Sequence, residues 1–290
     1  MNATTVLGGG ASLPPSEGLS TAHISTPVPA RPPKGSPSVL YAEGGNLLSV
    51  TIPSNRPTLG GGKRGKVYGF SRNSRKRMLR LVNSINRTKV EPRQALFVTL
   101  TYPAVWPSDP KVWAAHLQAF RMRLERRWGI HAVIWKKEPQ RRGAPHFHLL
   151  LLCDVKTAAQ VRIFRRWCSA AWYEVVGSGD AKHFRAGTQV ETVRSWRGVV
   201  SYAAKYLGKE SPGFVDQETG EVLATGRWWG VWNADRLPVE LKAIEVSYKA
   251  AYRLRRVVLR LRHWRAKWRN GVTTFLAAQD SERLVRWATT

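Results

Sequence analysis

Two tyrosines and two lysines at helical spacing could carry out phosphoryl transfer. Tyr202 and Tyr206 lie four residues apart in residues 196–209, whose apolar spacing predicts a helix. Both phenols are therefore expected on one helix face, with Lys205 and Lys209 beside them. An ammonium group next to a phenol can stabilise a phenolate or the charge that builds up on an attacked phosphate. The same tyrosines would also suit the edge of a hydrophobic core, so the helix alone does not separate nucleophiles from packing residues.

A pair of histidines lies on a predicted strand upstream of these tyrosines. His146 and His148 flank Phe147 in the apolar run 146–152. Because alternate residues of a strand face opposite ways, the two imidazoles are expected side by side, with Phe147 turned into the core. Two imidazoles on one face can chelate a divalent ion, but His-x-His by itself is a weak signal that structural histidines also produce.

A carboxylate completes this candidate set of ligands. Glu138 ends the preceding apolar run, and a hairpin through residues 139–144 would return the chain so that Glu138 lies beside His146. Two imidazoles and one carboxylate, with positions left for water and phosphate oxygens, suit Mg²⁺ or Mn²⁺ acting as a Lewis acid. The alternative is an ordinary carboxylate at a strand end that pairs with Arg141 or Arg142.

The elements that would position these groups alternate along the chain. Apolar periodicity predicts strands at 95–101, 131–137, 146–152 and 184–193, and helices at 110–128, 156–175 and 196–209. Thr99 and Thr101 alternate on the first strand, where they could support the histidines by hydrogen bonds or be ordinary strand residues. This order predicts an α+β fold with a central antiparallel sheet and helices packed on one face.

Composition divides the chain into four segments. Residues 1–62 are rich in Gly, Pro, Ser and Thr and predict a disordered tail, with room for one short strand around 47–52. Residues 63–93 predict a basic helical arm, residues 94–232 the main domain, and residues 233–290 a basic helical extension.

An excess of positive charge indicates a polyanionic partner. The chain has 47 Lys and Arg against 19 Asp and Glu, a formal net charge of +28. Nucleic acid would neutralise this charge, and the 13 Trp and 8 Tyr could stack on unpaired bases. An anionic membrane surface is the weaker alternative. The residues expected to contact DNA are Arg72, Arg75, Lys76, Arg77, Arg255, Arg256 and Arg260.

Several other kinds of site are not expected. Cys153 and Cys168 have no metal-ligand or disulfide-framework spacing and are expected to be buried thiols. No apolar run is long enough to cross a bilayer, and the N-terminal residues do not have the pattern of a signal peptide. The expectation is a cytoplasmic protein.

Three of these segments, in their order, resemble the motifs of the HUH endonuclease superfamily. The resemblance is carried by residues 97–102 (Phe-Val-Thr-Leu-Thr-Tyr), then Glu138 with residues 146–148, then the Tyr-x-x-Lys-Tyr-x-x-Lys sequence of residues 202–209. Residues 226–230 (Gly-Arg-Trp-Trp-Gly) resemble a segment that often follows. Within the superfamily, the pair of tyrosines is similar to the rolling-circle replication initiators of small single-stranded DNA phages and some plasmids.

The resemblance implies a ferredoxin-like (RRM-like) fold and metal-dependent nicking and joining of single-stranded origin DNA through a 5′-phosphotyrosine. The site residues implied are His146, His148 and Glu138 as ligands of Mg²⁺ or Mn²⁺, Tyr202 and Tyr206 as nucleophiles, Lys205 as the charge-stabilising residue and Lys209 as a phosphate contact. The implied partners are origin DNA and a host helicase and polymerase in the cytoplasm of a bacterial host. Neither a membrane nor a small-molecule substrate is implied.

Other functions fit parts of the same sequence. A transposase or a mobilisation relaxase of the superfamily would share the site chemistry. The chain has no GxxxxGK[ST] P-loop, which argues against initiators and transposases fused to a helicase. A non-catalytic single-stranded DNA-binding protein would use only the charge and the tryptophans. Metal-dependent nicking, present or absent, distinguishes the enzymes from the binding protein.

Overall fold

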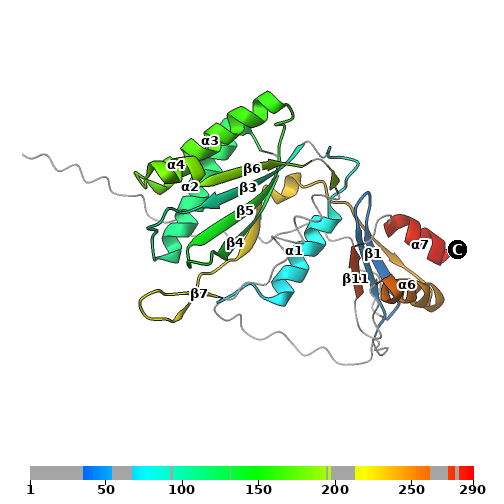
Figure 1. Ribbon diagram of the computed structural model, residues 1–290. Coiled ribbons are helices and arrows are strands. Elements are labelled where there is room, and N and C mark those ends of the chain that lie inside the picture. Colours follow the sequence, from blue (N-terminus) through cyan, green and yellow to red (C-terminus); the bar gives the residue numbers. More distant parts are fainter. Residues whose placement is uncertain are drawn as a thin grey trace, which may run out of the picture.

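The computed structural model describes residues 35–53, 67–91, 94–130, 132–193, 195–196, 213–261, 274–277 and 281–290. Two antiparallel sheets with helices packed on them make up this part of the chain, as Figure 1 shows. The α+β class predicted from the order of elements is therefore confirmed. In the same residues, no helix is both long and apolar enough to cross a bilayer.

The larger sheet has the strand order β6-β3-β5-β4-β9, and each of its neighbouring pairs is antiparallel. Its strands are β3 (Ala95–Thr101), β4 (Ala132–Pro139), β5 (Pro145–Leu152), β6 (Thr188–Thr192) and β9 (Trp229–Trp232). The hairpin predicted between β4 and β5 is present, and its turn is closed by a hydrogen bond from the Gln140 N–H to the Ala144 carbonyl, 2.9 Å long. This sheet holds the histidines at its centre, on β5.

Three helices pack on one face of this sheet: α2 (Pro110–Trp128), α3 (Ala158–Val176) and α4 (Ala181–Ala186). Local sequence signals set the ends of the two long ones. Asp109 caps α2 and Thr157 begins α3 with a capping box, while Gly129 and Gly177 end these helices in the left-handed conformation. The helices predicted at 110–128 and 156–175 are confirmed.

The strand predicted over residues 184–193 is correct only in its second half. Residues Ala181–Ala186 form α4 instead, and β6 begins at Thr188. The reason is local, because the Asp180 side chain accepts a hydrogen bond from the Lys182 N–H and so starts a helix at this point. Of the helix predicted at 196–209, only its first residue lies within the described part, where Trp196 is helical.

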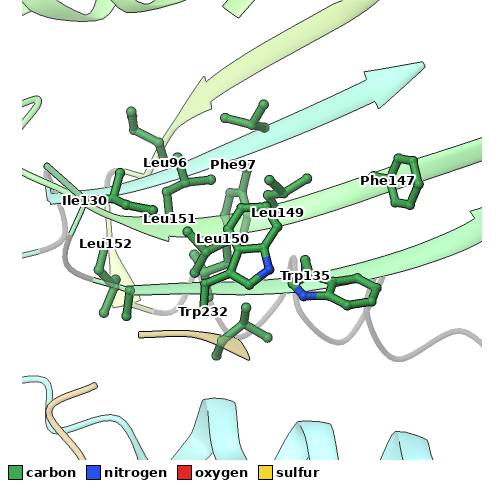
Figure 2. Close-up of a cluster of buried hydrophobic side chains, with 14 of the residues drawn as sticks. Leu96, Phe97, Ile130, Trp135, Phe147, Leu149, Leu150, Leu151, Leu152 and Trp232 are labelled. Carbon is green, nitrogen blue, oxygen red and sulfur yellow. The ribbon is translucent and has the colours of Figure 1, made fainter. Parts of the chain in front are cut away.

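The core of the larger sheet is formed on both of its faces. Figure 2 shows the run Leu149 to Leu152 on β5 among large side chains from neighbouring elements. All four of these leucines are at most 3% exposed, although consecutive residues of a strand face opposite sides. On the helix side, Phe147 packs against Trp172 of α3, with 6.2 Å between ring centroids. Both faces are therefore covered at this end of the sheet.

The second sheet has the order β10-β1-β2-β11 and joins distant parts of the chain. Its strands are β1 (Ser38–Ala42), β2 (Leu47–Thr51), β10 (Leu241–Glu245) and β11 (Thr274–Ala277), and the helices α6 (Tyr248–Leu261) and α7 (Ser281–Thr289) pack on it. Its core combines side chains such as Val39 and Val50 with Ala251, Leu254 and Val285.

These strands correct two expectations from composition. Residues 38–51 were expected in a disordered tail, apart from one short strand around 47–52, and they form two strands. Residues 233–290 were expected to be helical, and they also contribute β10 and β11. The apolar residues of β1 and β2 are too few to form a core alone, and their partners lie some 200 residues later in the sequence. The proposed segment boundaries at residues 62, 93 and 232 stay predictions.

The remaining elements connect the two sheets. Helix α1 (Arg72–Ser84) lies between them on the side of the larger sheet away from α2 and α3, as Figure 1 shows. It begins at Ser71, whose side chain accepts a hydrogen bond from the Ser74 N–H, as predicted for its cap. A small hairpin of β7 (Phe214–Val215) and β8 (Val222–Leu223) and a 3₁₀ turn at Ala234–Arg236 complete the described chain.

Candidate functional site

The two histidines occupy neighbouring positions on one face of β5. Strand register pairs His146 with Thr101 of β3 and Glu138 of β4, and it pairs His148 with Thr99 and Lys136. Paired residues of adjacent strands project to the same side of a sheet, so six polar side chains gather on the face opposite α3. The imidazole rings lie 4.6 Å apart between centroids, with planes at 79°. The predicted geometry of the pair is confirmed, with Phe147 turned into the core.

Glu138 bonds to His148 and to a buried lysine. Its Oε1 lies 2.9 Å from Nε2 of His148, and its Oε2 accepts a hydrogen bond from Nζ of Lys136 at 3.2 Å. Burial by itself would raise the pKa of Glu138, but the hydrogen bond and charge of His148 and the charge of Lys136 outweigh it and lower the pKa to about 2. Glu138 is therefore a carboxylate at neutral pH. The alternative pairing with Arg141 or Arg142 is wrong.

Lys136 is fully buried beneath this carboxylate. Its exposed fraction is 0%, and its Nζ lies 4.7 Å from the ring centroid of Phe70, just before α1. A buried ammonium needs both charge compensation and polar or aromatic contacts. Lys136 was missed as part of the site, although it precedes Glu138 by two residues on the same strand. The period of two along a strand was the signal that could have identified it.

His146 is held by a different set of partners. Its Nδ1 lies 3.0 Å from Oγ1 of Thr101 and 3.2 Å from Nε2 of Gln140. Burial, together with the neighbouring His148, lowers the pKa of His146 to about 4, so the ring is neutral at pH 7. The Gln140 side chain is oriented in turn, because its Oε1 accepts a hydrogen bond from Nε of Arg142 at 3.0 Å.

Arg142 also fixes the loop that follows β3. Its guanidinium donates hydrogen bonds to the carbonyls of Tyr102, Pro103 and Ala104 and lies 4.8 Å from the ring centroid of Trp106. Gln140 and Arg142 were not predicted to support the histidines. Because they belong to the turn of the hairpin, no periodicity in the sequence indicated where their side chains point.

The donor atoms suit a divalent ion in kind. Two imidazoles and a carboxylate are ligands for Mn²⁺ and, through oxygen and water, for Mg²⁺. Within the residues that the structure describes, however, no three His, Cys, Asp or Glu side chains surround one point as a ready ion site. His148 Nε2 and Glu138 Oε1 bond to each other instead. An ion would take the place of the proton shared by these two atoms, with small rotations of the rings.

The predicted nucleophiles lie outside the described residues. This applies to Tyr202, Tyr206, Lys205 and Lys209, whose roles stay predictions.

The predicted DNA contacts on α1 and α6 are described. Of the four on α1, Arg72, Lys76 and Arg77 are exposed and Arg75 is half-buried. On α6, Arg256 and Arg260 are exposed.

Arg255 corrects one of these predictions. Its side chain is only 5% exposed, because it lies one helical turn after Ala251 and next to Leu254, on the side of α6 that packs on the second sheet. Arg255 is therefore a buried residue of this core rather than a surface contact for DNA. Both cysteines, Cys153 and Cys168, are buried thiols as expected.

Comparison with known proteins gives the class of this chain. A family model that describes phage-type replication-associated proteins of the ORF2 group matches residues 95–211, the segment that begins at β3 and contains all the predicted catalytic residues. The chain is 31% identical over 210 residues to the replication-associated protein of Pseudomonas phage Pf3, covering 69% of this chain and 70% of that protein. The chain therefore belongs to this family of phage replication-associated proteins.

A second relative is more distant. The chain is 24% identical over 238 residues to the replication gene A protein of Escherichia phage P2, covering 65% of this chain but only 29% of that longer protein. No solved structure gives a significant match. The resemblance to phage replication initiators, predicted from the order of motifs, is confirmed.

Proposed function

We propose that this chain is a rolling-circle replication initiator of the HUH type, which cleaves and rejoins single-stranded origin DNA. The observation that supports this most directly is the gathering of His146, His148 and Glu138 on one face of the central sheet. Membership of a phage replication family agrees with a role at an origin.

The ligands of a divalent ion would be His146, His148 and Glu138. An Mg²⁺ or Mn²⁺ ion held there would act as a Lewis acid toward a phosphate oxygen. The protein supplies the orientation of these ligands. With Nε2 of each imidazole as the donor, Nδ1 carries the proton and can donate it to a threonine hydroxyl, Thr101 for His146 and Thr99 for His148. Lys136 keeps Glu138 ionised and holds its second oxygen.

Tyr202 or Tyr206 would be the nucleophile. The phenol oxygen attacks the phosphorus of the scissile phosphodiester and forms a P–O bond to the protein. The bond from phosphorus to the 3′ oxygen breaks, so the 3′-OH is released with the proton lost by the phenol, and the 5′ end stays on the tyrosine. Lys205 would stabilise the charge of the transition state and Lys209 would contact a phosphate. Because the number of phosphoester bonds is unchanged, reversal rejoins the strand without ATP.

The second tyrosine would cleave the regenerated origin after one circuit. The free 3′-OH would serve a host polymerase, and a host helicase would separate the strands, so the reaction would take place in the cytoplasm of a bacterial host. The exposed cations on α1 and α6 would contribute phosphate contacts.

The test is formation of a covalent adduct. Wild-type protein is mixed with single-stranded origin DNA, labelled on the 3′ side of the candidate nick, and Mn²⁺, and the products are separated under denaturing conditions. A labelled protein band that needs Mn²⁺ is expected. The band should be lost in the double variant Tyr202→Phe, Tyr206→Phe and in His146→Ala, but kept in Tyr248→Phe, a control at an exposed tyrosine of α6.

Two results would contradict the proposal. An adduct that survives in the double tyrosine variant would show that the nucleophile lies elsewhere. Salt-sensitive binding of the DNA without any adduct or nick would leave the chain as a non-catalytic single-stranded DNA-binding protein. A transposase or relaxase would instead join the cleaved end to a second DNA, which the same gel shows when an acceptor strand is added.

A further inference from the structure

The N-terminal end of α1 lies beside the candidate site. Phe70 immediately precedes the Ser71 cap, is 2% exposed, and its ring centroid lies 4.7 Å from Nζ of Lys136. Lys136 in turn donates to Glu138 at 3.2 Å. Only two side-chain contacts therefore separate the start of this helix from a carboxylate of the site.

Two residues before Phe70, an aromatic ring faces solvent. Tyr68 is 46% exposed, in contrast to the buried aromatic residues around it. Its backbone is tightly packed, because a Cβ added at Gly213 would come within 2.7 Å of the Tyr68 carbonyl oxygen. The ring is thus presented to solvent from a constrained backbone. An exposed ring of this kind can stack on an unpaired base without a sequence requirement.

A row of cations continues from Tyr68 along α1. Arg72, Lys76 and Arg80 follow one another at intervals of four residues, so they lie along one side of the helix. Helix α1 contains no acidic residue. Among the described residues, no carboxylate forms a salt bridge with Arg72 or Lys76, and both are exposed. This row is complementary in charge to a phosphate backbone.

The other end of α1 is anchored to the second sheet. The Asn46 N–H donates to the Asn83 carbonyl at 2.7 Å, and the Arg87 N–H donates to the Gly44 carbonyl at 2.9 Å. The helix has 13 residues, and at 1.5 Å per residue it spans about 20 Å between the site and this sheet. Figure 1 shows α1 in this position between the two sheets. The cations are thus carried by an element held at both ends.

We propose that Tyr68 and the cationic row Arg72, Lys76 and Arg80 bind the single strand that flanks the scissile phosphate. Tyr68 stacks on a base close to the cleaved bond, and the row neutralises the phosphates that follow, so the strand runs along α1 toward the second sheet. This inference rests on the proposed function, because it takes the face of His146 and His148 as the place of cleavage. The occupant is single-stranded DNA, since stacking needs a base face that a duplex does not offer.

The experiment measures binding without cleavage. Fluorescence anisotropy with single-stranded origin DNA is recorded in EDTA over a series of salt concentrations. Tyr68→Ala is expected to weaken binding roughly 5- to 150-fold with an unchanged salt slope, because stacking is lost and no phosphate contact is removed. Tyr68→Trp should bind as well as the wild type. Arg72→Gln with Lys76→Gln should reduce the slope of log K against log salt by about 1.4, at about 0.7 per phosphate contact on a single strand.

A matched control lies on the opposite side of the larger sheet. Phe184 on α4 is 43% exposed, and Arg162 and Arg166 on α3 are exposed cations four residues apart. Phe184→Ala, and Arg162→Gln with Arg166→Gln, remove the same kinds of group and should leave both affinity and salt slope near those of the wild type. Thermal melts of all variants confirm that each one folds.

The outcomes separate this proposal from the proposed function. If the α1 variants bind like the wild type, or if the α3 and α4 variants lose as much, the path along α1 is wrong even when the covalent adduct forms normally. If the α1 variants weaken binding as expected but no adduct ever forms, the binding surface stands and the nicking function fails. Equal losses for single-stranded DNA and a blunt duplex in Tyr68→Ala would also contradict stacking on a base.

Discussion

Replacing Lys137 with methionine should make the stability of the protein respond differently to alkaline pH. Lys137 follows Lys136 on β4 and faces the opposite side of the sheet, where it is 5% exposed. Its Nζ donates to the Thr225 carbonyl and lies 5.9 Å from the ring centroids of Phe214 and Trp228. Burial lowers the pKa of Lys137 from 10.5 to about 8.

The magnitude follows from the difference in pKa between the unfolded and folded states. That difference is 10.5 minus about 8 for Lys137. At 1.36 kcal/mol per pKa unit, it corresponds to about 3 kcal/mol. Below pH 8 the ammonium is charged in both states, and the folded state bears the whole cost of burying it. Between pH 8 and 10.5 the folded protein has lost this proton while the unfolded chain still holds it, so the stability of the wild type rises.

Lys137→Met keeps the length of the side chain and removes the charge. The wild-type free energy of unfolding, minus that of the variant, should therefore increase by about 3 kcal/mol between pH 7.5 and 10.5. Urea unfolding followed by tryptophan fluorescence at several pH values measures this difference, and the other titrating groups cancel in the comparison. Lys249→Met, at an exposed lysine of α6, is the control and should show a constant difference. Parallel stability curves for wild type and Lys137→Met would refute the buried-ammonium reasoning.

Three further changes test the site and its scaffold. Thr101→Val should lower Mn²⁺ affinity about 10- to 100-fold, because it removes the hydroxyl that orients His146; unchanged affinity by calorimetry would exclude this role. Trp172→Ala should destabilise the protein by about 3–5 kcal/mol, because a fully buried ring and its hydrogen bond to a backbone carbonyl are lost; a smaller loss in urea unfolding would mean that the core collapses into the space. Gly230→Ala should cost about 1–3 kcal/mol, because the added Cβ lies 2.9 Å from the Trp135 ring; an unchanged melting temperature would show that this ring moves freely.

The elements that could be predicted from sequence are those with local signals. The helix at 110–128 has an aspartate cap, a proline in its first turn and a glycine after its last residue, and the structure gives the same bounds. The strand at 95–101 also has the predicted bounds. The failure at 184–187 arose because the Asp180 cap of a six-residue helix was overlooked in favour of a longer apolar pattern.

The second sheet could not be predicted in the same way. Its central strands, β1 and β2, are short, and their outer neighbours β10 and β11 come from beyond residue 240. Composition at 38–51 indicates disorder, since these residues have too little apolar surface to offset the entropy of folding alone. Apolar partners from α6 and α7 supply the missing surface. Pairings between such distant segments leave no periodic trace in either of them.

The candidate site shows the same division. Alternation along β5 was enough to place His146 and His148 on one face, and hairpin closure was enough to bring Glu138 opposite His146 in the register. The bonding partner of Glu138 was not predictable, because its carboxylate reaches diagonally to His148 and to Lys136. Side-chain direction in a sheet depends on the strands on both sides, which sequence spacing does not specify.

The sequence by itself determined the α+β order of elements, the side-by-side histidines and the membership of a replication family, because each depends on local periodicity or on an order of motifs shared with relatives. Only the tertiary structure decided which charges are buried. Lys136 and Lys137 end an apolar run and would be expected to reach water, and Arg255 belongs to a helix full of exposed cations. A lysine or arginine is buried only where distant chain segments provide a carboxylate, a carbonyl or an aromatic face, and those partners meet only in the folded protein.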